Sequence, residues 1–222
     1  MYTWIKICGL ASKNDIDICI ENNVDAIGFL IQKELNIAQN DILEVSIAKE
    51  LIDYASTTIE TCLLIHLTNV KDILEIVKEL KPSMLQIQKK SHLQIENLQE
   101  IKRKFPKIKI SRTFNISKNI QSSDILNDIR KHIDCKCIDY VLLDSSKGGS
   151  GEVHNWEISA SIVQEIKPFP VILAGGLNPD NIDTAVKKVK PFGVDAMSGV
   201  SIEPGLKDKT KIKQLCSKIR EN

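Results

Sequence analysis

A regular alternation of two kinds of segment runs through the chain of 222 residues. Short segments rich in β-branched residues predict strands, and longer segments between them carry apolar residues at helical spacing. About eight such strand–helix units follow one another, which is typical of a parallel sheet with helical connections. The predicted strands are residues 4–8, 24–31, 61–67, 84–87, 108–112, 138–143, 171–174 and 193–196. The predicted helices are a first one capped by Ser12, then residues 42–52, 69–80, 92–105, 125–133, 156–166, 179–189 and 208–219.

Two architectures fit this alternation, a closed eight-stranded barrel and an open, doubly wound sheet. An open sheet is expected to carry a glycine-rich turn after its first strand. The first turn here reads Cys8-Gly9-Leu10-Ala11, and glycine-rich turns instead follow the last three predicted strands. Late phosphate-binding loops are typical of barrels. With no linker or shift in composition, we predict an α/β protein with a single (β/α)8 TIM-barrel domain spanning residues 1–222.

The composition argues against two classes of partner. The chain has 30 Lys and Arg residues against 29 Asp and Glu residues, a balance that does not favour nucleic-acid binding. No apolar run approaches the roughly 20 residues that span a bilayer, and the N-terminus lacks signal-peptide organisation. We therefore expect a cytoplasmic protein that binds neither nucleic acid nor membrane, and a monomer or a homodimer.

Six cysteines are scattered through the chain, and we do not expect a disulfide framework in a reducing compartment. Cys135 and Cys137 form the one close pair, with His132 nearby. Zinc sites usually combine cysteines two to four residues apart with a second pair elsewhere, and neither condition is met. We interpret the pair as small apolar side chains at a helix end and a strand start, and we expect no metal.

Polar side chains close several predicted strands, where a barrel has its active site. They are Lys6 and Cys8 on the first strand, Gln86 on the fourth, Arg112 on the fifth, Asp144 on the sixth and Asp195 on the eighth. We expect Lys6, Gln86, Arg112 and Asp195 to bind substrate.

Glycines follow the seventh and eighth strands, as Gly175-Gly176 and as Ser198-Gly199. Glycine lets backbone N–H groups turn toward an anion, and a following helix adds a favourable dipole. One such loop is equally explained as a tight turn, whereas two successive loops favour phosphate binding. A third glycine-rich stretch, residues 147–151, is interpreted as a lid rather than an unconstrained surface loop.

Cys8 and Asp144 would face each other across the mouth of a barrel. A thiolate is a competent base once its pKa is lowered, and Lys6 or a helix N-terminus could lower it. A desolvated carboxyl group can stay protonated and act as an acid. This pair, without metal or cofactor, suits a proton-shuttling isomerisation. The alternatives are that Cys8 is a core thiol and that Asp144 caps the following loop.

Several motifs fall in the order found in one known family. They are Lys6-Ile-Cys-Gly9, Asp25-Ala-Ile-Gly-Phe29, Leu143-Asp-Ser145, Gly148-Gly-Ser-Gly151 with Trp156, Ile172-Leu-Ala-Gly-Gly-Leu-Asn-Pro179, Val194-Asp195, Ser198-Gly-Val200, Pro204-Gly205 and Lys207-Asp208. Through these motifs the chain closely resembles the phosphoribosylanthranilate isomerases of tryptophan biosynthesis, almost from end to end.

The resemblance implies a cofactor-free Amadori rearrangement of a small phosphorylated substrate, N-(5-phosphoribosyl)anthranilate. It implies that Asp144 protonates the ring oxygen and that Cys8 removes the proton from the sugar C2. It also implies a phosphate site made by Gly149, Gly151, Gly176, Ser198 and Gly199.

Three motifs depart from the family's pattern. The Lys-Ser-Pro-Arg after the second strand, whose arginine contacts the anthranilate, is replaced by Gln32-Lys-Glu-Leu-Asn-Ile37. Gln-Leu-His-Gly appears as Gln86-Ile-Gln-Lys89, and Ser-Ser-Gly-Val-Glu as Met197-Ser-Gly-Val-Ser201. Three hypotheses follow: a working isomerase in which Lys33 or Arg112 binds the carboxylate, a phosphosugar isomerase with another aglycone, or a non-catalytic phosphosugar-binding protein. His154, beside the expected lid, is interpreted as solvated.

Overall fold

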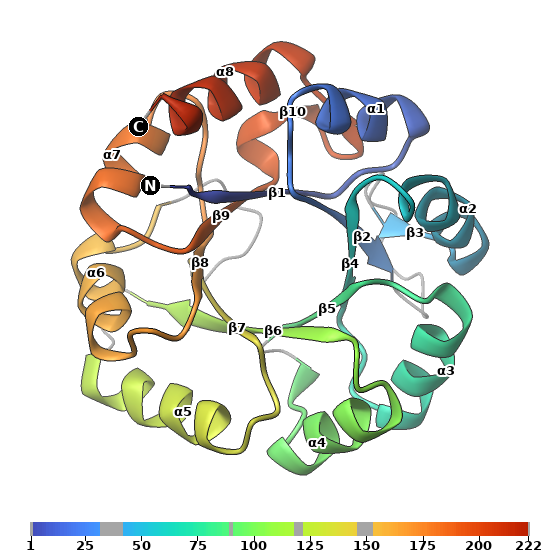
Figure 1. Cartoon of the computed structure of the whole chain (residues 1–222), viewed down its shortest axis with the longest axis vertical. Coiled ribbons are helices and arrows are strands. Elements are labelled where there is room, and N and C mark those ends of the chain that lie inside the picture. Colours follow the sequence, from blue (N-terminus) through green and yellow to red (C-terminus); the bar gives the residue numbers. More distant parts are fainter. Residues whose placement is uncertain (1, 32–41, 89–90, 118–121, 146–152, 222) are drawn as a thin grey trace.

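Parallel strands close into a ring in this computed structural model, which describes residues 2–31, 42–88, 91–117, 122–145 and 153–221. The order around the ring is β1-β9-β8-β7-β6-β5-β4-β2, and pairing of β1 with β2 closes it (Figure 1). The eight strands are β1 (Trp4–Cys8), β2 (Ala26–Ile31), β4 (Glu60–Ile65), β5 (Met84–Ile87), β6 (Lys109–Ile116), β7 (Tyr140–Ser145), β8 (Val171–Leu173) and β9 (Gly193–Ala196). The predicted (β/α)8 barrel is confirmed.

Helices surround this ring and follow the strands one by one (Figure 1). They are α1 (Lys13–Glu21), α2 (Val45–Ala55), α3 (Val70–Leu80), α4 (Ile95–Lys104), α5 (Ser122–Asp134), α6 (Trp156–Glu165), α7 (Ile182–Val189) and α8 (Lys209–Arg220). The predicted cap at Ser12 is confirmed, since its hydroxyl accepts the Asp15 N–H at 3.1 Å. Asn69 and Asp208 cap α3 and α8 in the same way.

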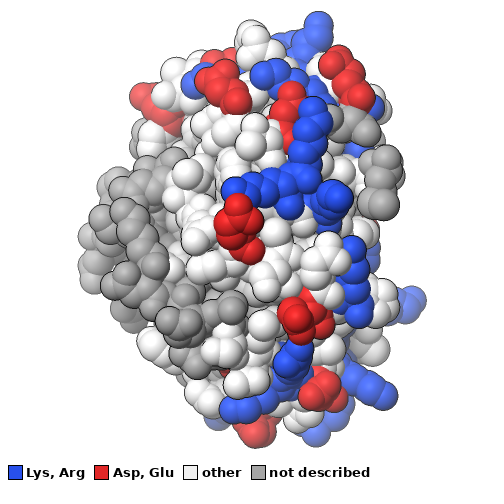
Figure 2. Space-filling view, turned by 90° about the vertical axis from the view of Figure 1, so that its left-hand side faces the viewer, with Lys and Arg blue, Asp and Glu red and all other residues white. Residues whose placement is uncertain are grey.

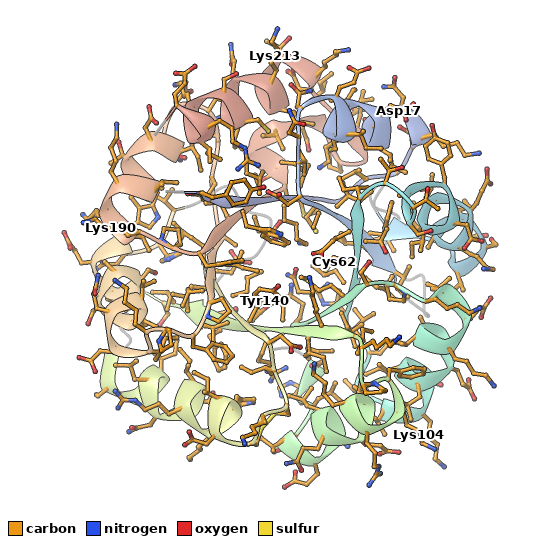
Figure 3. All side chains as sticks on the ribbon, in the orientation of Figure 1. Asp17, Cys62, Lys104, Tyr140, Lys190 and Lys213 are labelled. Atoms are coloured by element: carbon orange, nitrogen blue, oxygen red, sulfur yellow. A yellow bond between two sulfur atoms is a disulfide. The ribbon has the colours of Figure 1, made fainter. Side chains whose placement is uncertain are left out.

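Successive side chains of each strand point alternately outward to the helices and inward to the barrel. The outward residues, such as Ile5, Ile7 and Phe29, join the main core between strands and helices. The inward residues form a lower layer that includes Trp4 and Cys62, and an upper layer of Cys8, Leu30 and Leu64. Figure 3 shows Cys62 and Tyr140 inside the ring and Lys104 and Lys213 outside it. The barrel is thus filled with side chains, and ligands can reach it only at an end.

The two ends of the chain meet where the barrel closes. The Arg220 guanidinium at the end of α8 donates to the Thr3 carbonyl oxygen at 2.8 Å and lies 3.1 Å from the Asp25 carboxylate. Asp25 also accepts the Ile5 N–H at 2.7 Å. These contacts join the end of α8 to the starts of β1 and β2.

Four short elements were not predicted. A strand β3 (Ile42–Leu43) pairs with β2, and a 3-10 helix η2 (Ser198–Val200) follows β9. A hairpin of β10 (Ser201–Glu203) and β11 (Leu206–Lys207) then leads to α8. The hairpin brings Lys207 to the mouth of the barrel.

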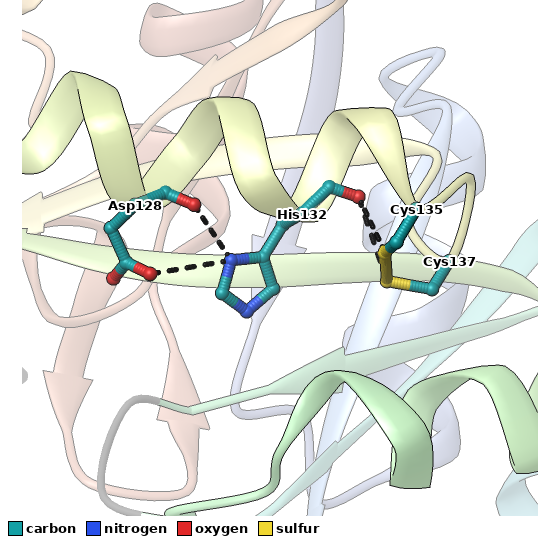
Figure 4. Close-up of a disulfide and its surroundings, with 4 residues drawn as sticks. All are labelled: Asp128, His132, Cys135 and Cys137. Carbon is teal, nitrogen blue, oxygen red and sulfur yellow. Dashed lines mark hydrogen bonds and ion pairs between the residues drawn. A yellow bond between two sulfur atoms is a disulfide. The ribbon is translucent and has the colours of Figure 1, made fainter.

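The interpretation of Cys135 and Cys137 as free apolar side chains is wrong. The structure joins them in a disulfide just after α5 (Figure 4). Their Cα atoms lie 5.4 Å apart, because Lys136 between them adopts a left-handed conformation with φ of 54°. The Sγ of Cys135 lies 3.0 Å from the carbonyl oxygen of His132. His132 itself lies against Asp128 on the preceding turn of the helix.

The surface carries charges of both signs. Figure 2 shows Lys and Arg side chains next to Asp and Glu side chains on the face that it views. Across the described residues, no helix is both long and apolar enough to cross a membrane.

Candidate active site

Strand alternation decides which predicted site residues point into the barrel. Lys6 and Cys8 lie on the inward side of β1, and register pairs them with Ala26 and Gly28 of β2. Gln86 on β5 contacts Lys6, so it points inward too. Asp144 near the end of β7 and Asp195 on β9 complete the set.

A buried ion pair lies below the mouth. The Lys6 Nζ donates to Asp195 Oδ2 at 2.7 Å and to Gln86 Oε1 at 2.9 Å, and the Lys6 side chain has no exposed area. Burial lowers the pKa of Lys6, but the Asp195 carboxylate outweighs this effect, so the pKa is raised. Lys6 is therefore a fixed cation, and Gln86 and Asp195 hold it in place.

Cys8 lies at the C-terminal end of β1 and is 2% exposed. Gly28 on the neighbouring strand makes room for the thiol, because a Cβ at that position would lie 2.7 Å from Sγ. Burial raises the pKa of Cys8, and the nearby Lys6 ammonium only partly opposes this effect. The expectation that Lys6 lowers this pKa below the ordinary value is therefore wrong, because desolvation of the thiolate is the larger effect.

Asp144 lies one residue before the end of β7 and is mostly buried. Burial raises its pKa to about 6, although the Ser145 N–H donates to Oδ1 at 2.7 Å and opposes the rise. Asp195 adds to the rise and Lys6 reduces it, both through space. The expected desolvated carboxyl group is therefore present at the mouth.

The turn after β8 is held by two asparagines that the sequence analysis missed. Gly175 and Gly176 adopt positive φ angles of 85° and 66°, which glycine tolerates. The Asn181 Nδ2 donates to the Gly176 carbonyl oxygen at 2.8 Å, and the Asn178 N–H donates to Asn181 Oδ1 at 3.0 Å. The spacing Asn-Pro-x-Asn before a helix is the signal that could have indicated this.

The same turn packs against the acid. A Cβ on Gly175 would lie 2.9 Å from Asp144 Oδ1, 2.8 Å from the Ser145 nitrogen and 3.3 Å from His154 Nδ1. Any side chain at Gly175 would therefore displace the carboxyl group.

The two predicted phosphate loops touch each other. A Cβ on Gly199 would collide with the carbonyl oxygen of Leu177, so the η2 backbone packs directly on the turn after β8. Ser198 precedes this contact and is exposed. Gly149 and Gly151 lie outside the described residues, as does the rest of the predicted lid.

The chain is similar to known proteins in both sequence and structure. The family model for N-(5'-phosphoribosyl)anthranilate (PRA) isomerase matches residues 5–218. The chain belongs to this family. N-(5'-phosphoribosyl)anthranilate isomerase 1 of Methanosarcina mazei is 33% identical over 229 residues, which cover 98% of this chain and 95% of the relative.

Solved structures of PRA isomerases share the fold. The enzyme from Pyrococcus furiosus superposes with a TM-score of 0.82 at 23% identity, over 100% of both chains. Another PRA isomerase, solved in complex with reduced 1-(o-carboxyphenylamino)-1-deoxyribulose 5-phosphate, superposes with a TM-score of 0.77 at 21% identity, over 100% of both chains.

Arg112, expected to bind substrate, does not face the mouth of this PRA isomerase family member. The prediction that it ends its strand is wrong, because β6 continues to Ile116. Arg112 shares the outward side of β6 with Phe114, which packs in the main core. Its Nη1 donates to the Gln88 carbonyl oxygen at 3.1 Å and to Ser91 Oγ at 3.3 Å. Arg112 thus supports the loop after β5.

Two further polar residues at the mouth were missed or misread. Lys207 is 4% exposed, and its Nζ donates to Ser201 Oγ at 2.9 Å. The interpretation of His154 as solvated is wrong, because its Nδ1 is buried and its Nε2 lies 2.7 Å from Ser159 Oγ; this burial lowers its pKa to about 4. Only the fold brings these residues to the mouth, since both follow segments without periodic structure.

The part of the chain that the structure describes contains no group of three or more His, Cys, Asp and Glu side chains that could hold a metal ion.

Proposed function

We propose that the chain converts N-(5'-phosphoribosyl)anthranilate to 1-(2-carboxyphenylamino)-1-deoxyribulose 5-phosphate, a step of tryptophan biosynthesis. The observation that carries this proposal is a buried carboxyl group with a pKa of about 6 at the mouth of a barrel of this family. A pKa near the working pH suits a group that must donate a proton.

Asp144 is the general acid. Its raised pKa keeps roughly a tenth of the molecules protonated near neutral pH, against less than one in a thousand for an ordinary aspartate. The proton passes to the ring oxygen of the ribose and the bond between C1 and this oxygen breaks. The lone pair of the anthranilate nitrogen then forms a C=N bond to C1, giving an iminium ion.

Cys8 is the general base. Its thiolate takes the proton from C2, and the electrons of that C–H bond form a C1=C2 double bond that neutralises the iminium nitrogen. The enol then becomes a ketone when its hydroxyl proton is replaced by a proton on C1. No atom is gained or lost overall, as an isomerisation requires.

Lys6 makes the thiolate attainable in a buried site. Its ammonium opposes the burial effect on Cys8 more strongly than the Lys207 ammonium, which acts in the same direction, and Asp195 and Gln86 fix its position. Gln86 and Asp195 therefore act on the reaction indirectly, by holding Lys6 in position.

The phosphate is bound by the backbone of Gly175, Gly176, Ser198 and Gly199. Support comes from the direct packing of η2 on the turn after β8 and from the positive φ angles of Gly175 and Gly176. Such turns can aim several N–H groups at one anion. By resemblance, Gly149 and Gly151 complete this site.

Two substitutions test the proton carriers. Cys8→Ala and Asp144→Asn are each expected to abolish isomerisation of the purified protein while leaving its circular dichroism spectrum unchanged. Full activity in either variant would contradict the role given to that residue.

Growth of a tryptophan auxotroph that lacks this isomerase tests the aglycone. Expression of the chain is expected to restore growth, and expression of Asp144→Asn is the matched control. A folded, expressed wild-type chain that restores no growth would contradict anthranilate as the aglycone.

A further inference from the structure

Of the two ring nitrogens of His154, one has a hydrogen-bond partner and the other has none among the described residues. This histidine lies just before α6, and its Nε2 lies 2.7 Å from the hydroxyl oxygen of Ser159, which has no exposed area. Its Nδ1 is buried and has no hydrogen-bond partner among the described residues. A buried ring nitrogen without a partner is costly, so its retention asks for an explanation.

The free nitrogen and the proposed acid both border the space next to Gly175. His154 Nδ1 and Asp144 Oδ1 lie 3.3 Å and 2.9 Å from one point, the place where a Cβ of Gly175 would be. Both atoms therefore flank the same side of Gly175. Because burial lowers the pKa of His154 to about 4, the ring is neutral near pH 7 and carries a single N–H.

We propose that His154 is a positioning residue of the reaction, whose Nδ1–H donates a hydrogen bond to the Asp144 carboxylate once Asp144 has given up its proton. In this arrangement the Ser159 hydroxyl donates to Nε2, as required by the tautomer that carries its hydrogen on Nδ1. This inference rests on the proposed role of Asp144 as the acid.

Few other groups act on this carboxylate. Lys6 on β1 lowers the pKa of Asp144 and Asp195 on β9 raises it, both through space, while the Ser145 N–H and, at 3.4 Å, the Ser145 hydroxyl donate to Oδ1 directly. A further direct donor, from a different segment of the chain, stabilises the anion that forms when the ring oxygen takes the proton. His154 therefore makes Asp144 a stronger acid than burial alone would leave it.

Three variants separate the two ring nitrogens. In place of histidine, an Asn side chain puts its amide nitrogen near the position of Nδ1. A Gln side chain is longer and reaches the position of Nε2. His154→Asn keeps the donor to Asp144, His154→Gln keeps only the contact to Ser159, and His154→Phe keeps only the ring shape. Ser159→Ala removes the hydroxyl that contacts Nε2, so either ring nitrogen of the unchanged histidine can carry the hydrogen.

The readout is the titration of Asp144, followed by NMR of carboxyl carbons in aspartate-labelled protein and assigned with Asp144→Asn. We expect the apparent pKa of Asp144 to rise by about one unit in His154→Gln and His154→Phe, and to change little in His154→Asn. The acidic limb of the pH profile of kcat/KM is expected to shift to higher pH together with the pKa of Asp144. Ser159→Ala is expected to give an intermediate shift.

An unchanged Asp144 titration in both His154→Gln and His154→Phe would overturn the inference, and so would equal shifts in the Asn and Gln variants. If His154→Phe does not fold, the comparison of Asn with Gln decides alone. A purely structural role predicts lower melting temperatures without a shift of the limb. Failure of the proposed acid is separate, since it would appear as activity in Asp144→Asn.

Discussion

Cys8 and Asp144 are buried at the same end of the barrel, yet burial affects their proposed roles in opposite ways. Removing either anion from water is unfavourable, so burial raises the pKa of both groups. For Asp144 the result is a carboxyl group that can hold a proton near neutral pH. For Cys8 the result is a neutral thiol, which is not a base. The base side of the site therefore needs a cation that the acid side does not.

Of the two cations that lower the pKa of Cys8, Lys6 acts more strongly than Lys207, and its substitution is expected to have the largest effect. Lys6→Met leaves the Asp195 carboxylate buried without its ion-pair partner, which destabilises a protein by about 3–5 kcal/mol. It also removes the charge that stabilises the thiolate, so kcat is expected to fall by about 100-fold or more. Urea unfolding and steady-state kinetics measure the two effects.

The double variant Lys6→Met/Asp195→Leu separates stability from chemistry. Replacing both partners of a buried ion pair by apolar residues is often neutral, so stability is expected to return while activity does not. Restored activity in the double variant would show that Lys6 serves only the fold.

Asp144 is expected to lose its function when a neighbouring side chain displaces its carboxyl group, without any change of charge. Gly175→Ala places a methyl group 2.9 Å from Asp144 Oδ1, so the carboxyl group must move, and kcat is expected to fall by about 100-fold. Gly205→Ala is the matched control, because Gly205 also has a positive φ, of 81°, in the turn between β10 and β11. The control is expected to lose stability but keep kcat. Equal losses of kcat in both variants would contradict the contact with Asp144.

The pH profile should reveal both shifted groups at once. The active form needs Asp144 protonated and Cys8 ionised, although Asp144 has the lower pKa. Below about pH 6, kcat/KM is expected to fall tenfold per pH unit, because the acid is already protonated while thiolate is lost. Between the two pKa values the profile is flat, and it falls again only above the ordinary thiol value of about 8.5. An alkaline limb at or below 8.5 would contradict a raised pKa for Cys8.

The smallest expected effect is a gain in stability. The pKa of Asp144 is raised from 3.8 to about 6, so the folded state binds its proton more tightly than the unfolded state does. Its stabilising contribution is complete below pH 4 and is lost as the pH rises through 6. At pH 7.5, Asp144→Asn is expected to be more stable than the wild type by about 2–3 kcal/mol, and at pH 4 by only about 0.5 kcal/mol. Denaturant titrations at both pH values measure this, and a loss of stability at pH 7.5 would contradict the raised pKa.

The sequence predicted the barrel because strand and helix periodicity depend on local residue order. The strands at residues 4–8, 84–87 and 193–196 have the predicted bounds, and the cap at Ser12 is confirmed. The fifth predicted strand was too short, since β6 continues to Ile116. Its inward residues Ser111 and Thr113 are polar, which a sequence pattern cannot distinguish from a strand end.

The site residues at strand ends could be predicted because, like the strands themselves, they depend on local residue order. A polar residue or a glycine that ends an apolar strand is visible in the sequence, as Cys8, Asp144 and Gly175 show. Arg112 was misplaced because the direction of its side chain depends on the register of β6. His154 was misread because its burial depends on the turn after β8, which lies about twenty residues further along the chain.

The sequence by itself thus determined the order of the strands and which chemical groups stand at their ends. Only the tertiary structure decided how each group behaves there, because a pKa depends on burial and on neighbours distant in the sequence. Lys6 and Asp195, which form the buried ion pair, are 189 residues apart. Burial raises the pKa of the base and of the acid alike, and only the fold brings Asp195 and Gln86 to Lys6, the cation two residues before the base.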